Sequence, residues 1–118
     1  MLCSMMCLSS SDRLFNAVVQ VESGGNPAAV GDHGQAHGLI QAHRGAWRDG
    51  CKALGVSWSY DSGVRDRREC QAVFYAYTSR YSAMTPEQRA RCWNSGPNWR
   101  GRYKATDGYW SRVKGAMR

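Results

Sequence analysis

The sequence predicts an α+β domain that is mainly α, with a helical body and a small lobe of loops or a short hairpin. Apolar residues recur at helical spacing in four or five segments of the 118-residue chain. Between the first two segments, five glycines occur within residues 23–38, and glycine is unfavourable inside a helix. We expect one domain with one core, which we place at residues 11–118.

The first predicted helix covers residues 11–23, where Leu14, Val18 and Val21 lie on one face. The turn sequence "GGNP" ends this helix, because glycine favours helix ends and proline disfavours a helical residue before it. We expect the glycine-rich segment that follows to form a loop or a small hairpin.

The second and third predicted helices cover residues 44–54 and 66–82. Cys51 falls on the apolar face of one helix and Cys70 on that of the other. Two interpretations therefore stay open: a disulfide between the two cysteines, or two buried free thiols. The other members of the two apolar stripes are Trp47 and Leu54 on the second helix, and Phe74, Tyr77 and Tyr81 on the third.

Two further helices are expected in the last third of the chain. One begins at Pro86, because Thr85 and Gln88 have the positions of a capping box, and it ends in the turn sequence "CWNSGPN". The other is expected to begin near Thr106 and to bury Tyr109 or Trp110, Val113 and Met117.

The chain is basic, with 16 Lys and Arg against nine Asp and Glu and a net charge of +7. This balance favours polyanionic partners such as nucleic acid, anionic membrane surfaces or bacterial wall polymers. The basic residues are scattered, so the charge alone selects none of these partners. No apolar run reaches the roughly 18 to 20 residues that a membrane span requires.

Residues 1–10 allow several interpretations. The sequence "MLCSMMCLS" is apolar, but no Lys or Arg precedes its apolar run. A remnant of a secretion signal, a wrongly assigned start, a disordered N-terminus and an ordinary first helical turn all stay open.

Glu22 is the first candidate catalytic residue. It follows Val18 by four residues, so a helix places its carboxyl group over the apolar stripe. Partial desolvation disfavours the charged form and raises the pKa of a carboxyl group. A general acid needs such an environment to hold its proton near neutral pH. The alternative is a salt-bridged glutamate at a helix end.

Asp32 is the second candidate, because it lies within "VGDHG", where glycines allow the backbone to fold back toward the helix. Two carboxyl groups brought close together are the arrangement that glycosidases use. A plain turn that contains Asp and Gly is the competing interpretation. Most of the other seven acidic residues lie at predicted helix starts or on polar faces.

Several motifs together resemble one family. "VESGGNP" followed by "GDHGQAHGLIQ" resembles the catalytic segment of the lysozyme-like superfamily, which includes goose-type lysozymes and soluble lytic transglycosylases. "RARCWNSGPN" and "ATDGYWSRVKGAM" are similar to the motifs that close invertebrate-type (destabilase-like) lysozymes, and "GAWRDGC" and "AYTSRY" match further segments in the same order. The resemblance covers roughly residues 16–117.

The resemblance implies a lysozyme-like fold with a cleft between the helical domain and the small lobe. It also implies cleavage of the β-1,4 bond between N-acetylmuramic acid and N-acetylglucosamine in peptidoglycan, with Glu22 as general acid and Asp32 as second carboxylate. Asn94 would contact sugar or support Glu22. The substrate-binding residues that the resemblance implies are Ser23, Gln41, Asn94 and Tyr109.

Three departures from the family pattern affect these expectations. Most of the cysteine framework of the animal enzymes is missing, which suggests a bacterial or viral relative. Ser95 replaces a glycine. Ala42 stands where goose-type enzymes carry a further carboxylate, which argues against an inverting, goose-like mechanism.

Alternatives to a hydrolase stay open at this point. A lytic transglycosylase would use Glu22 alone, and a more distant alternative is a non-catalytic module that binds cell wall or nucleic acid. We expect a monomer, secreted or at the cell envelope, that acts on peptidoglycan or chito-oligosaccharides and needs no cofactor. The three histidines His33, His37 and His43 fit no common metal motif, so we expect no metal site there.

Overall fold

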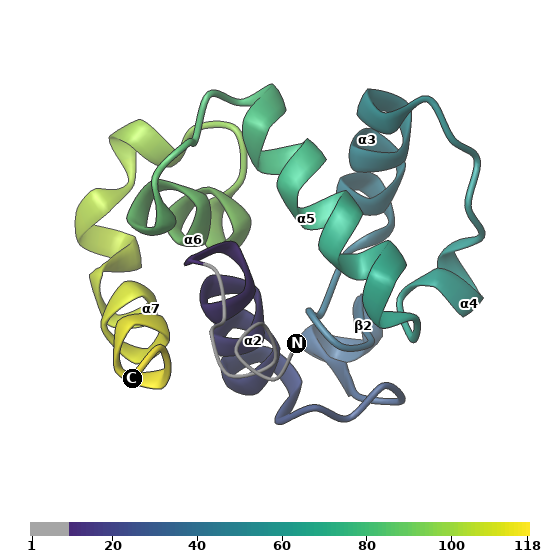
Figure 1. The fold of residues 1–118 in the computed structure, drawn as a ribbon, viewed down its shortest axis with the longest axis horizontal. Coiled ribbons are helices and arrows are strands. Elements are labelled where there is room, and N and C mark those ends of the chain that lie inside the picture. Colours follow the sequence, from purple (N-terminus) through teal and green to yellow (C-terminus); the bar gives the residue numbers. More distant parts are fainter. Residues whose placement is uncertain (1–9) are drawn as a thin grey trace, which may run out of the picture.

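The computed structural model of the protein describes residues 10–118, which form six α-helices, two 3-10 helices and one two-stranded sheet (Figure 1). The mainly helical α+β class predicted from the sequence is confirmed. In chain order the elements are α2 (Ser10–Ser23), β1 (Val30–Gly31), η1 (Asp32–Gly34), β2 (Ala36–His37), α3 (Arg44–Leu54), α4 (Tyr60–Gly63), α5 (Arg67–Arg80), α6 (Pro86–Ser95), η2 (Trp99–Gly101) and α7 (Tyr103–Ala116).

The helical body is built around α5, which lies between α3 on one side and the group α2, α6 and α7 on the other (Figure 1). The rings of Phe15 on α2 and Phe74 on α5 lie 6.1 Å apart between their centroids, and both side chains are buried. Val18 and Val113 extend the same core toward α7. Most of the apolar stripes read from the sequence enter this core, but Tyr77 belongs to a second buried cluster with Cys92 and Trp99. Leu54, which we expected on the apolar face of its helix, is exposed.

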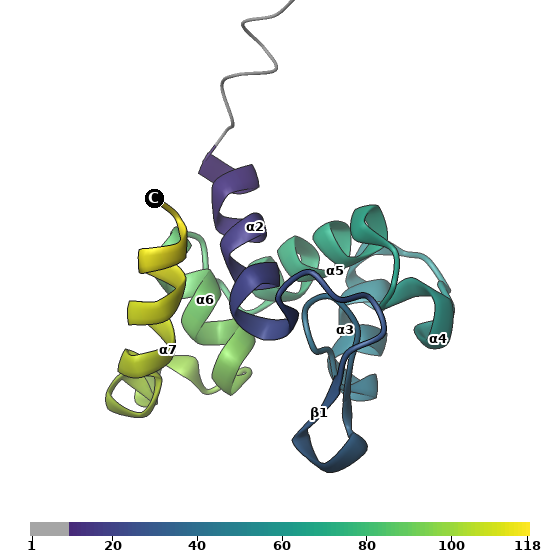
Figure 2. The ribbon, with the colours of Figure 1, turned by 90° about the horizontal axis from the view of Figure 1, so that it is seen from below.

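The small lobe is a hairpin that projects from the helical body (Figure 2). Its strands pair antiparallel, with Val30 opposite His37 and Gly31 opposite Ala36. At its tip the left-handed backbone region holds Asp32, His33 and Gly34 with φ of 50°, 55° and 89°. Asp and Gly tolerate this region better than most residues do. The prediction of a loop or small hairpin in this segment is confirmed.

Hydrogen bonds fix the chain that returns from the hairpin to the helical body. The Ser23 hydroxyl donates to the carbonyl of Leu39 at 2.7 Å, and the Trp93 indole donates to the carbonyl of Ile40 at 2.9 Å. The Leu39 amide donates to the carbonyl of Val64 at 2.9 Å. Gly38 makes this approach possible, since its φ is 83° and a side-chain carbon there would collide with Val64.

Some boundaries differ from the sequence-based expectations. The short helices α4 and η2 were not predicted, and α7 begins at Tyr103, three residues before the expected start at Thr106. The buried guanidinium of Arg91 explains the earlier start, because it donates to the carbonyl of Tyr103 and to the hydroxyl of Thr106. Thr106 in turn donates to the carbonyl of Arg102 and so lies within the helix rather than capping it.

The cysteines of the described residues are free thiols, and all three are buried: Cys51, Cys70 and Cys92. The disulfide between Cys51 and Cys70 that the sequence left open is therefore not formed. The Cys70 thiol instead donates to the carbonyl of Val64 at 3.3 Å. Except for Ser10, the N-terminal segment 1–10 that we set apart lies outside the described residues. No helix within residues 10–118 is long and apolar enough to cross a membrane.

Candidate active site

Glu22 lies near the C-terminal end of α2, at the point where the chain leaves the helical body for the hairpin. Its Oε2 atom accepts a hydrogen bond of 2.8 Å from the hydroxyl of Tyr109 on α7. Burial raises the pKa of Glu22 from 4.5 to about 7, while the Tyr109 hydrogen bond and the positive charge of Arg112 oppose this rise. The predicted desolvation of this carboxyl group is confirmed.

Glu69 is a second carboxyl group whose pKa is raised, first by burial and then by the charge of Asp66. Its Oε1 atom is buried, with no hydrogen-bond partner among the described residues. The same atom lies beside Gly63, next to the ring of Trp47, between α4 and α5. Glu69 is one of the seven other acidic residues of the sequence, and the burial of its Oε1 atom was not predicted.

Asp32 occupies the tip of the hairpin and is mostly exposed, with 58% of its side-chain surface accessible. Its Oδ2 atom lies 2.8 Å from Nε2 of His43, the residue that precedes α3. Asp32 is not among the groups that shift the pKa of Glu22. The second candidate carboxylate is therefore solvated and paired with an imidazole, and it does not contact Glu22.

Ser23 and Gln41 hold the backbone of the lobe. Besides its bond to Leu39, the Ser23 hydroxyl accepts from the amide of Gly25 at 3.2 Å. The Gln41 amide group donates to the carbonyls of Ala29 and Gly38 at 3.1 Å each. Both side chains thus set the shape of the lobe beside Glu22, and sequence analysis, which assigned them to substrate binding, did not predict these backbone contacts.

Tyr109 and Asn94, the other two residues implied to bind substrate, differ in their surroundings. Tyr109 is only 5% exposed, and its hydroxyl is bonded to Glu22. Asn94 is exposed near the end of α6. Within residues 10–118 no hydrogen bond joins Asn94 to Glu22, so the support of the acid comes from Tyr109.

The structure therefore brings most of the predicted site residues to one place. The C-terminal end of α2, the segment 38–41, the indole of Trp93 and the phenol of Tyr109 are linked by the hydrogen bonds described above. Asp32 and His43 form a second group at the hairpin. A hollow of about 330 Å³ next to this pair is lined by His37, His43 and Tyr60, among other residues.

The histidines do not form a metal centre in the described part of the chain. His37 Nε2 lies 2.9 Å from the carbonyl of Gly34, and His43 contacts Asp32. No group of three or more His, Cys, Asp or Glu side chains among residues 10–118 is arranged to hold a metal ion.

Comparison with known proteins adds no family assignment. A scan against protein-family models and a search of curated proteins found no match to this chain.

The raised pKa of Glu22 predicts a pH-dependent cost to stability. The native state holds this proton up to about pH 7, whereas the unfolded chain releases it near 4.5, so native stability falls as the pH rises between these values. The Glu22→Gln variant has no titrating group at this position, so its stability does not fall in this way. We expect the variant to gain as much as roughly 3 kcal/mol in unfolding free energy relative to the parent between about pH 4 and pH 8, as followed by urea denaturation. A constant difference across this range would contradict the burial of Glu22.

Proposed function

We propose that the protein is a glycosidase that cleaves the β-1,4 bond between N-acetylmuramic acid and N-acetylglucosamine in peptidoglycan. The observation that carries the proposal is the buried carboxyl group of Glu22, with its pKa near 7 and its hydrogen bond from Tyr109. The helical body, from which α2 leads into a hairpin lobe, supports the assignment because the lysozyme-like fold implied by the motifs has such a body and lobe. The motif resemblance supplies the substrate class.

Glu22 is the proton donor in this proposal. Because Tyr109 donates to Oε2, the transferable proton of the neutral acid belongs on Oε1. Transfer to the glycosidic oxygen releases the leaving sugar and leaves a carboxylate on Glu22. The Tyr109 hydroxyl and the charge of Arg112 then stabilise that carboxylate, since both lower the pKa of Glu22.

Asp32 is the proposed second carboxylate, acting as nucleophile, as stabiliser of the oxocarbenium-like transition state or as base for water. Each of these roles requires the carboxylate to face the sugar, and the contact with His43 Nε2 at 2.8 Å fixes the orientation of the Asp32 side chain. A separation of about 5 Å between the two carboxyl groups goes with retention, and roughly 6.5 to 9.5 Å goes with inversion.

A lytic transglycosylase is the second candidate function, and the exposure of Asp32 favours it. If Asp32 serves only to hold the hairpin through His43, Glu22 is the one acid at the site. A carboxyl group with a pKa near 7 can donate a proton and take one back at neutral pH. The muramic acid hydroxyl would then close onto its own anomeric carbon and give an anhydro-sugar.

Mass spectrometry of digested peptidoglycan tests both functions. A hydrolase yields reducing muropeptides, and a transglycosylase yields anhydro-muropeptides that lack one water. A non-catalytic module that binds cell wall yields neither product, and this outcome would overturn the proposal. The Glu22→Gln variant, purified in the same way, controls for contaminating enzymes. Action on the cell wall also implies a secreted or envelope-associated protein.

Tyr109→Phe tests the assignment of Glu22 as the acid, because it changes the pH dependence of kcat/KM. Removing the hydroxyl removes a contact that lowers the pKa of Glu22, so the alkaline limb of kcat/KM is expected to move above pH 7. Turnover at the optimum should fall by about tenfold, because the carboxylate formed on proton transfer loses a hydrogen bond. Tyr77→Phe is the matched control, since Tyr77 is buried on α5 and does not contact Glu22. An unmoved limb in Tyr109→Phe would contradict the role of Glu22.

A further inference from the structure

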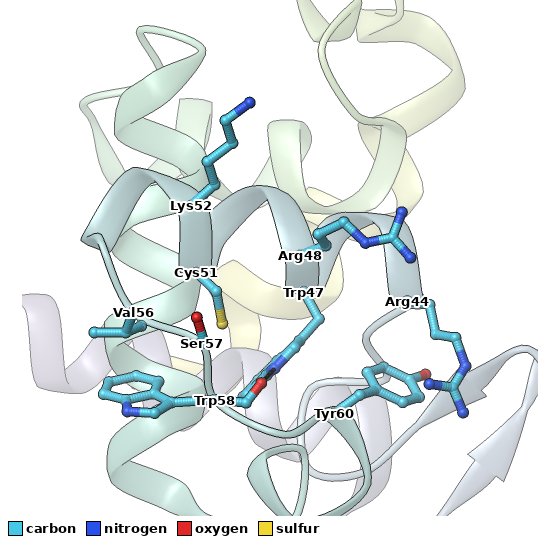
Figure 3. Close-up of a pocket in the computed structure, with 9 residues that line it drawn as sticks. All are labelled: Arg44, Trp47, Arg48, Cys51, Lys52, Val56, Ser57, Trp58 and Tyr60. Atoms are coloured by element: carbon cyan, nitrogen blue, oxygen red, sulfur yellow. Dashed lines mark hydrogen bonds between the residues drawn. The ribbon is translucent and has the colours of Figure 1, made fainter.

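A pocket lies between α3 and the chain segment that follows it (Figure 3), and neither Glu22 nor Asp32 lines it. We call it the α3 pocket, and its volume is about 510 Å³. The residues that matter for its chemistry are Arg44, Trp47, Arg48, Lys52, Trp58 and Tyr60. Its size falls within the range of roughly 300 to 1,000 Å³ that is usual for small-molecule sites.

The aromatic side of the α3 pocket is held in place by hydrogen bonds and ring contacts. The Trp47 indole donates to the carbonyl of Trp58 at 3.1 Å, and the Tyr60 hydroxyl donates to the carbonyl of Ala42 at 2.6 Å. The rings of Trp47 and Tyr60 meet edge to face, with 6.4 Å between their centroids. Trp47 is itself buried, so a ligand would stack on the half-buried rings of Trp58 and Tyr60, which these contacts preorganise.

The other side of the α3 pocket is cationic. Arg44, Arg48 and Lys52 follow one another at intervals of four residues on α3, so they share one face of the helix. Among the described residues that line the pocket, none is acidic. The exposed carboxylate of Asp61 pairs with Arg44 at 3.4 Å, and the ion pairs within residues 10–118 do not include Arg48 or Lys52.

Figure 3 shows how the two sides combine. The guanidinium of Arg44 lies 4.4 Å from the centroid of the Tyr60 ring, so a cation borders the aromatic surface directly. The Arg48 side chain leaves α3 apart from the Arg44 guanidinium, and the Lys52 side chain extends away from the rings, so both cations lie at the rim. A ligand that fits this pocket presents an apolar ring face to the aromatic side chains and a negative charge to α3.

We propose that the α3 pocket binds an anionic saccharide, that is, a sugar ring that carries a carboxylate or a phosphate. The apolar face of a pyranose stacks on indole and phenol rings, and the cations of α3 neutralise the acidic substituent. A neutral sugar would leave Arg48 and Lys52 without a charged partner among the described residues. The lining residues form a single hollow, which suits a short saccharide better than the extended groove that tracks a nucleic acid backbone.

The experiment uses the full chain as Glu22→Gln, so that no probe is cleaved. Nitrogen-15 spectra follow the indole N–H signals of Trp47 and Trp58 during titration with four probes. These are a disaccharide-peptide from peptidoglycan, glucosamine 6-phosphate, neutral di-N-acetylchitobiose and a short oligothymidylate. We expect saturable shifts with one or both anionic sugars, and at least about tenfold weaker binding of the neutral disaccharide. The carboxylate and phosphate probes identify which acidic group the pocket prefers.

Two variants of equal charge separate the pocket from the net charge of the protein. In Arg48→Gln with Lys52→Gln we expect the affinity for the preferred probe to fall by about tenfold. The control is Arg68→Gln with Lys114→Gln, two exposed cations on α5 and α7. The affinity of this control variant for the same probe should stay within about twofold of that of the parent. Equal losses in both variants, no indole shift, or tighter binding of the oligothymidylate would overturn the proposal. Because the readout is binding by an inactive variant, the result does not depend on whether Glu22 cleaves peptidoglycan.

Discussion

Glu22→Gln is expected to lower peptidoglycan cleavage by about three orders of magnitude or more. The amide keeps the shape of the side chain, but it cannot donate the proton that Glu22 holds up to about pH 7. General acid catalysis usually contributes about 10² to 10⁴ in rate. Turbidity clearing of a bacterial wall suspension measures the loss, and thermal unfolding near neutral pH should show a variant at least as stable as the parent.

Glu69→Gln is the matched control for this experiment. Glu69 is the other carboxyl group whose pKa burial raises, but it lies between α4 and α5, and no hydrogen bond links it to Glu22 among the described residues. We expect this variant to keep its activity within about threefold of the parent, because no step of the proposed reaction involves it. Equal activities of Glu22→Gln and Glu69→Gln would refute the assignment of the acid.

Asp32→Asn is expected to lower hydrolysis by about 100-fold or more under the two-carboxylate mechanism. The change removes the negative charge and keeps the backbone, because Asn is as well suited as Asp to the left-handed conformation that residue 32 adopts, with φ of 50°. Losing the exposed contact with His43 should cost at most about 1 kcal/mol of stability. A large loss of rate in a protein of unchanged melting temperature therefore reports on the charge.

His43→Gln separates the two explanations of Asp32. This variant removes the imidazole and leaves the carboxylate, so a catalytic Asp32 should still support most of the activity. If both variants show the same small loss and the products are anhydro-muropeptides, the Asp32–His43 contact only holds the hairpin. The transglycosylase mechanism with Glu22 alone would then replace the two-carboxylate mechanism.

The sequence predicts well the features that depend on neighbouring residues. The capping box of Thr85 and Gln88 is present, and it locates the start of α6 at Pro86. α3 has the predicted boundaries, because the left-handed Gly55 ends it. The desolvation of Glu22 was predicted from its spacing to Val18 within one helix.

Features that depend on distant residues were not predicted. The contact between Tyr109 and Glu22 joins residues 87 positions apart. No local pattern indicates that a tyrosine on the apolar face of the last helix directs its hydroxyl at the acid. The start of α7 likewise depends on Arg91, which contacts the first turn of that helix from α6. The pairing of Asp32 with His43 also depends on how the hairpin folds back toward α3.

The attachment of the hairpin has a consequence for how this protein can change over evolutionary time. Strands of two residues are too short to hold a conformation alone, so the lobe takes its shape from the helical body. The position of Asp32, the proposed second carboxylate, thus depends on the anchors at Ser23, Trp93 and Gly38. Residues of the exposed tip other than Asp32 can diverge while these anchors stay fixed, so the surroundings of Asp32 can change without a change at Glu22.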